Sequence, residues 1–97
     1  MHLVFSRSAK NHTGLRAFFE TGSKAGIVAQ HAARLRRILG VLDAAQTIDQ
    51  VNTPGLRLHK LTGRLAGFWS VSVSGNWRVI FRFENGDAEL VDYLDYH

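Results

Sequence analysis

Five side chains with the right chemistry for proton transfer and phosphate binding lie in the second half of the chain. They are His59, Arg78, Asp95, Tyr96 and His97. Imidazoles exchange protons near neutral pH, because their reference pKa is about 6.5. A guanidinium stays charged and donates paired hydrogen bonds to a phosphate. Such a set could cleave RNA without a metal: a base activates the 2′-hydroxyl, a cation stabilises the phosphorane and an acid protonates the 5′-oxygen.

Other chemistry is less favoured by the residue types and their spacing. The chain has no cysteine, which excludes thiol catalysis, cysteine-ligated metals and disulfides. A metal site built from His59, Asp95 and His97 matches no known ligand spacing. His2, His12 and His31 do not converge with these groups and are interpreted as structural. We therefore expect neither a metal nor a cofactor.

Alternating apolar and polar residues predict the strands that must position these groups. We expect strands over 56–61, 69–74, 77–84 and 88–97, joined by turns at Thr62–Arg64, Gly75–Asn76 and Asn85–Gly86. In the first of these, Leu56 and Leu58 belong to the core, so Arg57 and His59 face outward. The core residues of the next two strands are Trp69, Val71, Val73, Trp77, Val79, Phe81 and Phe83.

Side chains alternate between the faces of a sheet, so parity decides which groups can meet. Arg78 and Arg82 then project away from the core, on the same face as His59. In the last strand we assign Tyr93, Asp95 and His97 to this open face and Leu90, Leu94 and Tyr96 to the core. A bulge or a frayed end could move Tyr96 across.

The first half of the chain reads as mostly helical. Residues 3–5 form a short strand, and a helix carrying Leu15, Phe18 and Phe19 ends at Thr21–Gly22. Apolar spacing predicts a helix over 27–45, with His31 and the nearby arginines on its polar side, and one further turn over 47–51. The expected fold class is α+β: β-α-α followed by an antiparallel meander of about four strands, with the helices on one sheet face. Residues 1–97 form one domain.

The charge of the chain favours a phosphate-rich partner. The 97 residues carry a formal net charge of +4, and nine of the twelve basic residues are arginine. Arginine-rich small domains commonly bind nucleic acid, although an acidic protein partner is an alternative. Arg34, Arg36 and Arg37 could grip a nucleic acid backbone or form a solvated helix face. No segment resembles a signal peptide or a membrane span, so we expect a cytoplasmic protein.

Several motifs in the same order resemble the HigB family of RelE-type toxins. In the β half they are Pro54–His59, Gly67–Val71, Gly75–Arg78 and Asp95–His97; in the helical half they are Phe18–Ile27 and His31–Arg37. The resemblance covers nearly the whole chain. It implies a bacterial type II toxin with a RelE-like, microbial-ribonuclease-like fold that cleaves mRNA in the A site of the 70S ribosome, without metal.

The resemblance also implies partners and residue roles. The partner would be a helix-turn-helix, HigA-like antitoxin encoded by the same operon, through which the toxin reaches operator DNA. The catalytic residues would be His59, Arg78, Asp95, Tyr96 and His97. The residues expected to contact RNA or the ribosome are Arg57, Arg64, Asn76, Arg82, Arg34, Arg37 and Lys60.

One position departs from the family pattern. The family commonly has a lysine three residues after its first histidine, and Thr62 stands there in this chain. Either Arg64 or Lys60 replaces the missing cation, or the stabilisation of the phosphate falls more heavily on Arg78. Lys60 has the wrong parity for the open face, so Arg64 is the favoured replacement.

Two other functions remain open at the level of sequence. A ParE-like toxin that inhibits gyrase would share the fold, but such chains generally lack the histidine cluster. A basic RNA-binding module without activity would share the charge.

Overall fold

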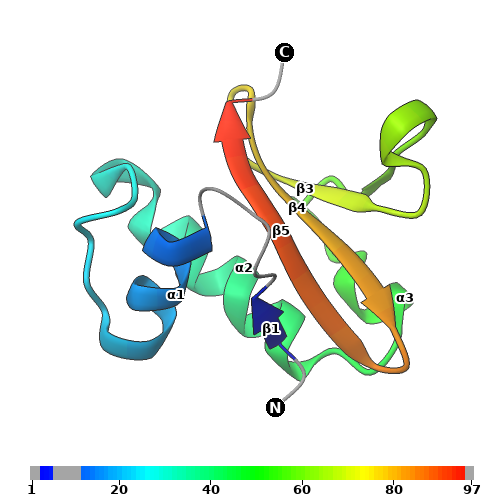
Figure 1. The fold of residues 1–97 in the computed structure, drawn as a ribbon, viewed down its shortest axis with the longest axis horizontal. Helices are drawn as coiled ribbons and strands as arrows, with labels where there is room; N and C mark the ends of the chain where they lie inside the picture. Colours follow the sequence, from blue (N-terminus) through cyan, green and yellow to red (C-terminus); the bar gives the residue numbers. More distant parts are fainter. Residues whose placement is uncertain (1–2, 6–11, 96–97) are drawn as a thin grey trace.

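The computed structural model describes residues 3–5 and 12–95, which form a mixed α+β domain (Figure 1). One five-stranded sheet has the order β1-β5-β4-β3-β2. The last four strands form an antiparallel meander, and β1 pairs in parallel with β5. The predicted fold class is confirmed. The strands are β1 (Leu3–Phe5), β2 (His59–Lys60), β3 (Trp69–Ser74), β4 (Trp77–Glu84) and β5 (Asp87–Asp95).

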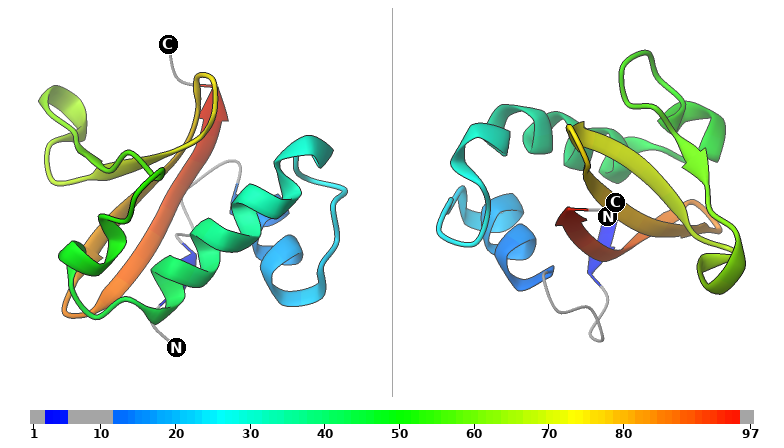
Figure 2. Two further views of the ribbon diagram at one scale, coloured as in Figure 1. Left: turned by 180° about the vertical axis from the view of Figure 1, so that it is seen from behind. Right: turned by 90° about the horizontal axis from the view of Figure 1, so that it is seen from above.

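The main helix crosses one face of this sheet (Figure 2). The helices are α1 (His12–Thr21), α2 (Ala32–Ala44) and the single turn α3 (Ile48–Val51), with 3₁₀ turns η1 (Ala29–His31) and η2 (Gly63–Leu65). Leu35, Ile38, Leu39 and Leu42 of α2 are fully buried, as their helical spacing predicts. The predicted start of this helix at Ile27 is wrong, because Val28 is extended and η1 separates it from α2.

The two faces of the sheet differ in chemistry. The face under α2, here called the helix face, carries Val71, Val79 and Phe81, each with no exposed surface. The opposite face, here called the outer face, carries Ser70, Arg78, Ile80 and Arg82, which alternate with those core residues in β3 and β4. The parity predicted for β3 and β4 is confirmed from Trp69 to Ser72, but a bulge between Ser72 and Ser74 places Ser74 opposite Trp77, where the prediction for Ser74 is wrong. The outer face is not fully open, because Ser70 and Ile80 are also buried.

The parity predicted for the end of β5 is wrong. Phe81 pairs with Leu90, whereas its neighbour Ile80 pairs with Asp92, so Val91 is an extra residue without a partner on β4. Such a β-bulge reverses the alternation beyond it. Tyr93 and Asp95 consequently lie on the helix face, and Leu94 lies on the outer face opposite Arg78.

The predicted strand over 56–61 is shorter than expected. Only His59 and Lys60 are strand, and they pair with Ser70 and Trp69. Arg57 has a φ of 53°, which a continuous strand does not allow. Leu56 is still fully buried and its carbonyl accepts a hydrogen bond of 2.8 Å from the Ser72 amide. His59 therefore reaches the outer face, as predicted, from a two-residue strand at the sheet edge.

Within residues 3–5 and 12–95, none of the helices has the length and apolar character needed to span a membrane.

Candidate functional site

His59 and Arg78 meet at a hollow of about 300 Å³ on the outer face. Its walls come from adjacent strands, because His59 pairs with Ser70 and Arg78 pairs with Ser72. The lining residues are His59, Lys60, Leu61, Ser70 and Arg78. The predicted meeting of an imidazole and a guanidinium on this face is confirmed.

Arg78 is half-buried in this hollow. Its Nη1 is shielded from solvent, and no hydrogen-bond acceptor reaches it from the residues that the structure describes. A shielded cationic donor without a partner is costly, so folding alone does not favour it. The same donor would bind an anion strongly, because water competes little for it. The arrangement suits an oxygen of a phosphate beside the exposed His59 imidazole.

Neither basic residue near Thr62 supplies a second cation to the hollow. Lys60 contributes to the wall, but its Nζ lies 5.9 Å from the centroid of the Trp69 ring, its partner on β3. This confirms the parity expected for Lys60. Arg64 is exposed in η2 and does not line the hollow. Arg57 and Asn76 are exposed as well, in the segment before β2 and in the β3–β4 turn.

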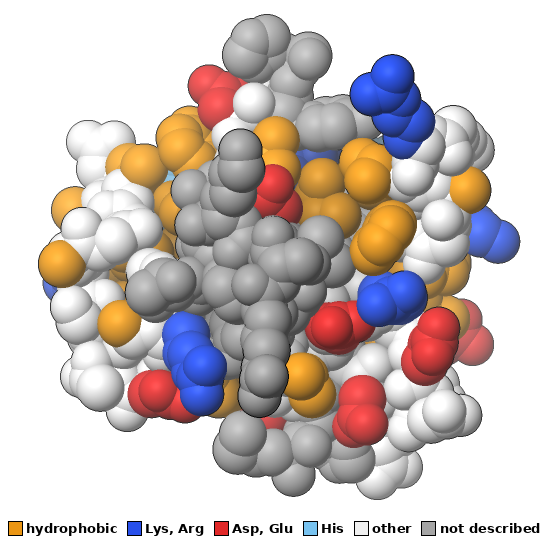
Figure 3. All heavy atoms as spheres, in the orientation of Figure 1, with side chains coloured by type: hydrophobic (Ala, Val, Ile, Leu, Met, Phe, Trp, Pro, Cys, Tyr) orange, Lys and Arg blue, Asp and Glu red, His pale blue; other side chains and the backbone are white. Residues whose placement is uncertain are grey.

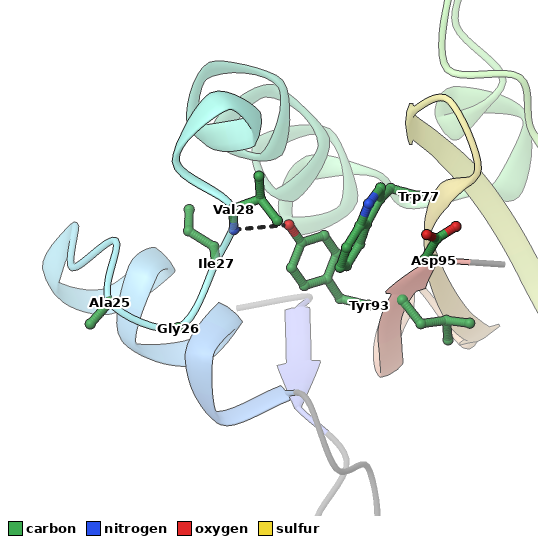
Figure 4. A pocket seen from close by; sticks show the side chains of 8 residues that line it. Ala25, Gly26, Ile27, Val28, Trp77, Tyr93 and Asp95 are labelled. Carbon is green, nitrogen blue, oxygen red and sulfur yellow. Dashed lines mark hydrogen bonds between the residues drawn. The ribbon is translucent and has the colours of Figure 1, made fainter.

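Asp95 does not face this hollow. It pairs with Trp77 and lines a different cavity of about 390 Å³ on the helix face (Figure 4). That cavity lies between the end of β5 and the loop over 25–28, and Trp77 and Tyr93 also line it. The considered metal site is not assembled either, since His59 and Asp95 lie on opposite faces. The predictions for Tyr96 and His97 concern residues outside the described ones.

A buried group that the sequence interpretation missed lies beside this cavity. His31 is 6% exposed and its Nδ1 lies 2.7 Å from the hydroxyl oxygen of Tyr93, which is 3% exposed. The Val28 amide donates to the same hydroxyl over 3.3 Å. His31 was expected on the polar side of its helix, but its spacing from Leu35, Ile38 and Leu42 matches the buried stripe. That spacing is the signal by which it could have been found.

Burial affects the protonation of both groups. Desolvation lowers the pKa of His31 from its ordinary value. Desolvation raises the pKa of Tyr93, and the hydrogen bond from Val28 opposes this in part. Both side chains are therefore neutral at physiological pH. Tyr93 accepts from Val28 and can donate its own proton to His31 Nδ1.

Two of the arginines expected to grip RNA bind the protein backbone. Arg34 donates to the carbonyl of Gly55, and Arg37 donates to the carbonyl of Pro54 over 3.3 Å. Both tie α2 to the turn that precedes β2. Arg37 is nonetheless exposed, in agreement with the solvated helix face considered for these arginines, whereas Arg34 is half-buried.

Arg82 is surrounded by acidic side chains, although the protein as a whole has a net positive charge. It forms an ion pair of 2.7 Å with Glu89, its partner on β5, and this pair raises the pKa of Arg82. Glu84 and Asp87 line the same surface hollow at the β4–β5 hairpin. In Figure 3, acidic side chains gather toward this end of the sheet. The positive charge of Arg82 is thus largely compensated.

Comparisons with known proteins decide the family. Residues 8–97 match the family model described as HigB-like toxin, a RelE-like toxin of the type II toxin-antitoxin system HigB. The chain belongs to the HigB-like toxin family. It is 42% identical over 86 residues to Endoribonuclease HigB of Proteus vulgaris, covering 89% of this chain and 94% of that protein. It is 35% identical over 85 residues to Toxin HigB-1 of Vibrio cholerae serotype O1, covering 86% and 88%.

Solved structures show that this HigB-like chain shares its fold with other RelE-like toxins. The YoeB–YefM complex from Staphylococcus aureus matches with a TM-score of 0.66 at 13% identity, covering 100% of this chain and 97% of the other. A YoeB/ParE toxin from Agrobacterium tumefaciens matches with a TM-score of 0.60 at 17% identity, covering both chains fully. At such low identity these likenesses concern the fold alone.

Proposed function

We propose that this HigB-like toxin is a metal-independent endoribonuclease that cleaves mRNA in the ribosomal A site and thereby inhibits translation. The observation that carries the proposal is the hollow on the outer face, where the solvent-shielded Nη1 of Arg78 lies beside the exposed His59 imidazole. The resemblance of the chain to Endoribonuclease HigB over most of its length supports the same activity.

The chemistry assigns one role to each group in the hollow. Arg78 holds a non-bridging oxygen of the scissile phosphate and stabilises the charge that grows as the 2′-oxygen attacks. His59 exchanges a proton with one of the two reacting oxygens, which its exposed position allows. The reaction then yields a 2′,3′-cyclic phosphate and a free 5′-hydroxyl.

A second proton carrier is required on the other side of the phosphate. The family resemblance assigns it to the terminal residues, and we retain Tyr96 and His97 in that role. Asp95 lies on the helix face and not beside Arg78. We therefore propose that Asp95 transfers no proton directly in this hollow.

The proposal includes the partners that such a toxin requires. The antitoxin is a helix-turn-helix, HigA-like protein from the same operon, and operator DNA is reached through it. The substrate is mRNA held by the 70S ribosome in the cytoplasm. The candidates for contacts with the ribosome or its mRNA are three exposed residues: Arg57 before β2, Arg64 in η2 and Asn76 in the β3–β4 turn.

Mapping of mRNA 5′ ends after brief induction tests this function. Cells expressing the wild-type chain should accumulate new 5′-hydroxyl ends within translated codons and stop growing. Cells expressing His97→Ala should show neither effect, while the protein stays folded. Arg16→Ala is the matched control, because Arg16 is an exposed arginine of α1 that pairs with Glu20, and it should cleave like the wild type.

Two results would contradict the proposal. Undiminished cleavage by a folded His97→Ala variant would exclude the terminal residues from the mechanism. Intact mRNA with accumulating DNA breaks after induction of the wild-type chain would instead indicate a ParE-like action on gyrase.

A further inference from the structure

The ring cluster behind the sheet joins three distant parts of the chain. His31 comes from η1, Trp77 begins β4, and Tyr93 lies near the end of β5. The His31 and Trp77 rings meet edge to face at 5.3 Å, and the Trp77 and Tyr93 rings lie 4.9 Å apart at a tilt of 40°. Figure 4 shows Tyr93 reaching from β5 toward Val28, with Trp77 beside it.

The hydrogen bonds of this cluster have defined donors and acceptors. The Val28 N–H donates to the Tyr93 hydroxyl, and that hydroxyl lies 2.7 Å from His31 Nδ1. A neutral His31 satisfies this geometry when Nδ1 accepts the Tyr93 proton and Nε2 carries the hydrogen. A phenylalanine at position 93 would fill the same volume, so the buried hydroxyl contributes something other than packing. Buried polar pairs of this kind specify one arrangement among similar ones.

The His31–Tyr93 pair bears on the register of β5 against β4. The bulge at Val91 shifts the strand by one residue, and this shift alone brings Tyr93 to the helix face. Without the bulge, Asp92 or Leu94 would occupy that side, and neither could complete the bonds to Val28 and His31. The hydroxyl is thus satisfied only in the bulged register.

We infer that His31 and Tyr93 are positioning residues that lock the end of β5 in register with β4. Tyr93 fixes the strand two residues before Asp95, from which the chain continues into the proposed terminal catalytic residues. Trp77, which packs against both rings, precedes Arg78 in the outer-face hollow. The pair therefore fixes the end of β5 relative to β4, the strand that carries Arg78, without touching the substrate. Its kinetic consequence rests on the proposed ribonuclease function, whereas its structural consequence does not.

The test compares Tyr93→Phe with Ile38→Val. The first removes one buried hydroxyl and keeps the ring; the second trims a fully buried residue of α2 that is about 10 Å along the helix from His31. In Tyr93→Phe we expect amide exchange over Asp92–Asp95 to accelerate about tenfold, since the bonds of the hydroxyl to Val28 and to His31 are both lost. We expect kcat on ribosome-bound mRNA to fall about tenfold, with KM unchanged. Ile38→Val should show neither effect at a similar loss of Tm.

Variants at position 31 give an independent check. His31→Gln keeps an acceptor for the Tyr93 proton, so it should retain slow exchange at the end of β5 and most of kcat. His31→Phe removes only the bond to His31, so it should change exchange and kcat in the same direction as Tyr93→Phe. Because Tyr93→Phe already removes that bond, the double variant should be no slower in cleavage than Tyr93→Phe.

The outcomes separate this inference from the proposed function. If the wild-type chain cleaves no RNA, the exchange experiment still decides: acceleration confined to 92–95 supports the register lock, and the proposed function alone fails. If Tyr93→Phe exchanges like Ile38→Val, the lock does not exist. If exchange accelerates but kcat stays at the wild-type value, the pair has no positioning role in the reaction.

Discussion

Trp77 and Asp95 are direct partners across β4 and β5, while the next pair, Arg78 and Leu94, faces the opposite side of the sheet. The two faces of the sheet therefore have different roles at this end of the molecule. Arg78 and His59 form an anion-binding hollow outside, and the aromatic cluster holds the strand ends from inside. The C-terminal end of β5 lies beside the β3–β4 turn (Figure 1).

Replacing Arg78 should separate activity from stability. Arg78→Met removes the cation from the hollow and should lower cleavage about 100-fold or more, the usual effect of losing a preorganised donor to a developing anion. The Tm should not fall, because the shielded Nη1 has no acceptor among the described residues and its desolvation cost disappears. Cleavage assays and thermal unfolding check both parts. Arg16→Met, on exposed α1, is the control for lost charge; equal activity of the two variants would contradict the assignment.

The stability of the protein should depend on pH through His31. Its folded pKa lies below the unfolded value of about 6.5, so the unfolded chain binds the proton more readily. Stability is then complete above pH 6.5 and falls as the pH drops from there toward the lowered folded value. Unfolding midpoints in urea across this range should show the slope. His31→Gln, which does not titrate, should flatten it; an unchanged slope would assign the effect to another group.

Gly14 should tolerate no side chain. The backbones of α1 and the following loop touch here: a Cβ added at Gly26 would lie 2.5 Å from the Gly14 Cα, and one at Gly14 would lie 2.8 Å from the Gly26 carbonyl carbon. Gly14→Ala must push these segments apart and should cost about 2 kcal/mol or more. Gly40→Ala is the control, since Gly40 lies in α2 with open space around it and should gain about 0.5–1 kcal/mol. Urea denaturation gives both values.

Arg34 should matter for stability more than for RNA binding. Its guanidinium bonds to the Gly55 carbonyl, so Arg34→Gln should lower the free energy of unfolding by about 1 kcal/mol. Arg37→Gln should cost less, because the Arg37 side chain is exposed whereas Arg34 is half-buried. Chemical denaturation measures the difference. A variant at position 34 with wild-type stability but weakened ribosome binding would show that this arginine contacts RNA after all.

Much of the sheet could be predicted because its signals are local. Alternation assigns Val71, Val79 and Phe81 to the core whatever lies around them. Asn85 and Gly86 have φ values of 53° and 80°, the left-handed backbone that a tight hairpin demands of its two turn residues. The alternation, together with the turn at Gly75–Asn76 that pairs β3 with β4, also predicts the approach of His59 to Arg78, and the structure confirms it.

The face of the sheet on which Asp95 lies could not be predicted from local alternation. A bulge depends on how β5 pairs with its partner strand, so the type of residue at position 91 does not predict it. The contact of His31 with Tyr93 spans 62 residues of sequence and exists only once that bulge has set the register. Local residue preferences thus establish the elements and most of their faces. The faces at the end of β5, and the cluster that holds them, come from packing between segments that are remote in the chain.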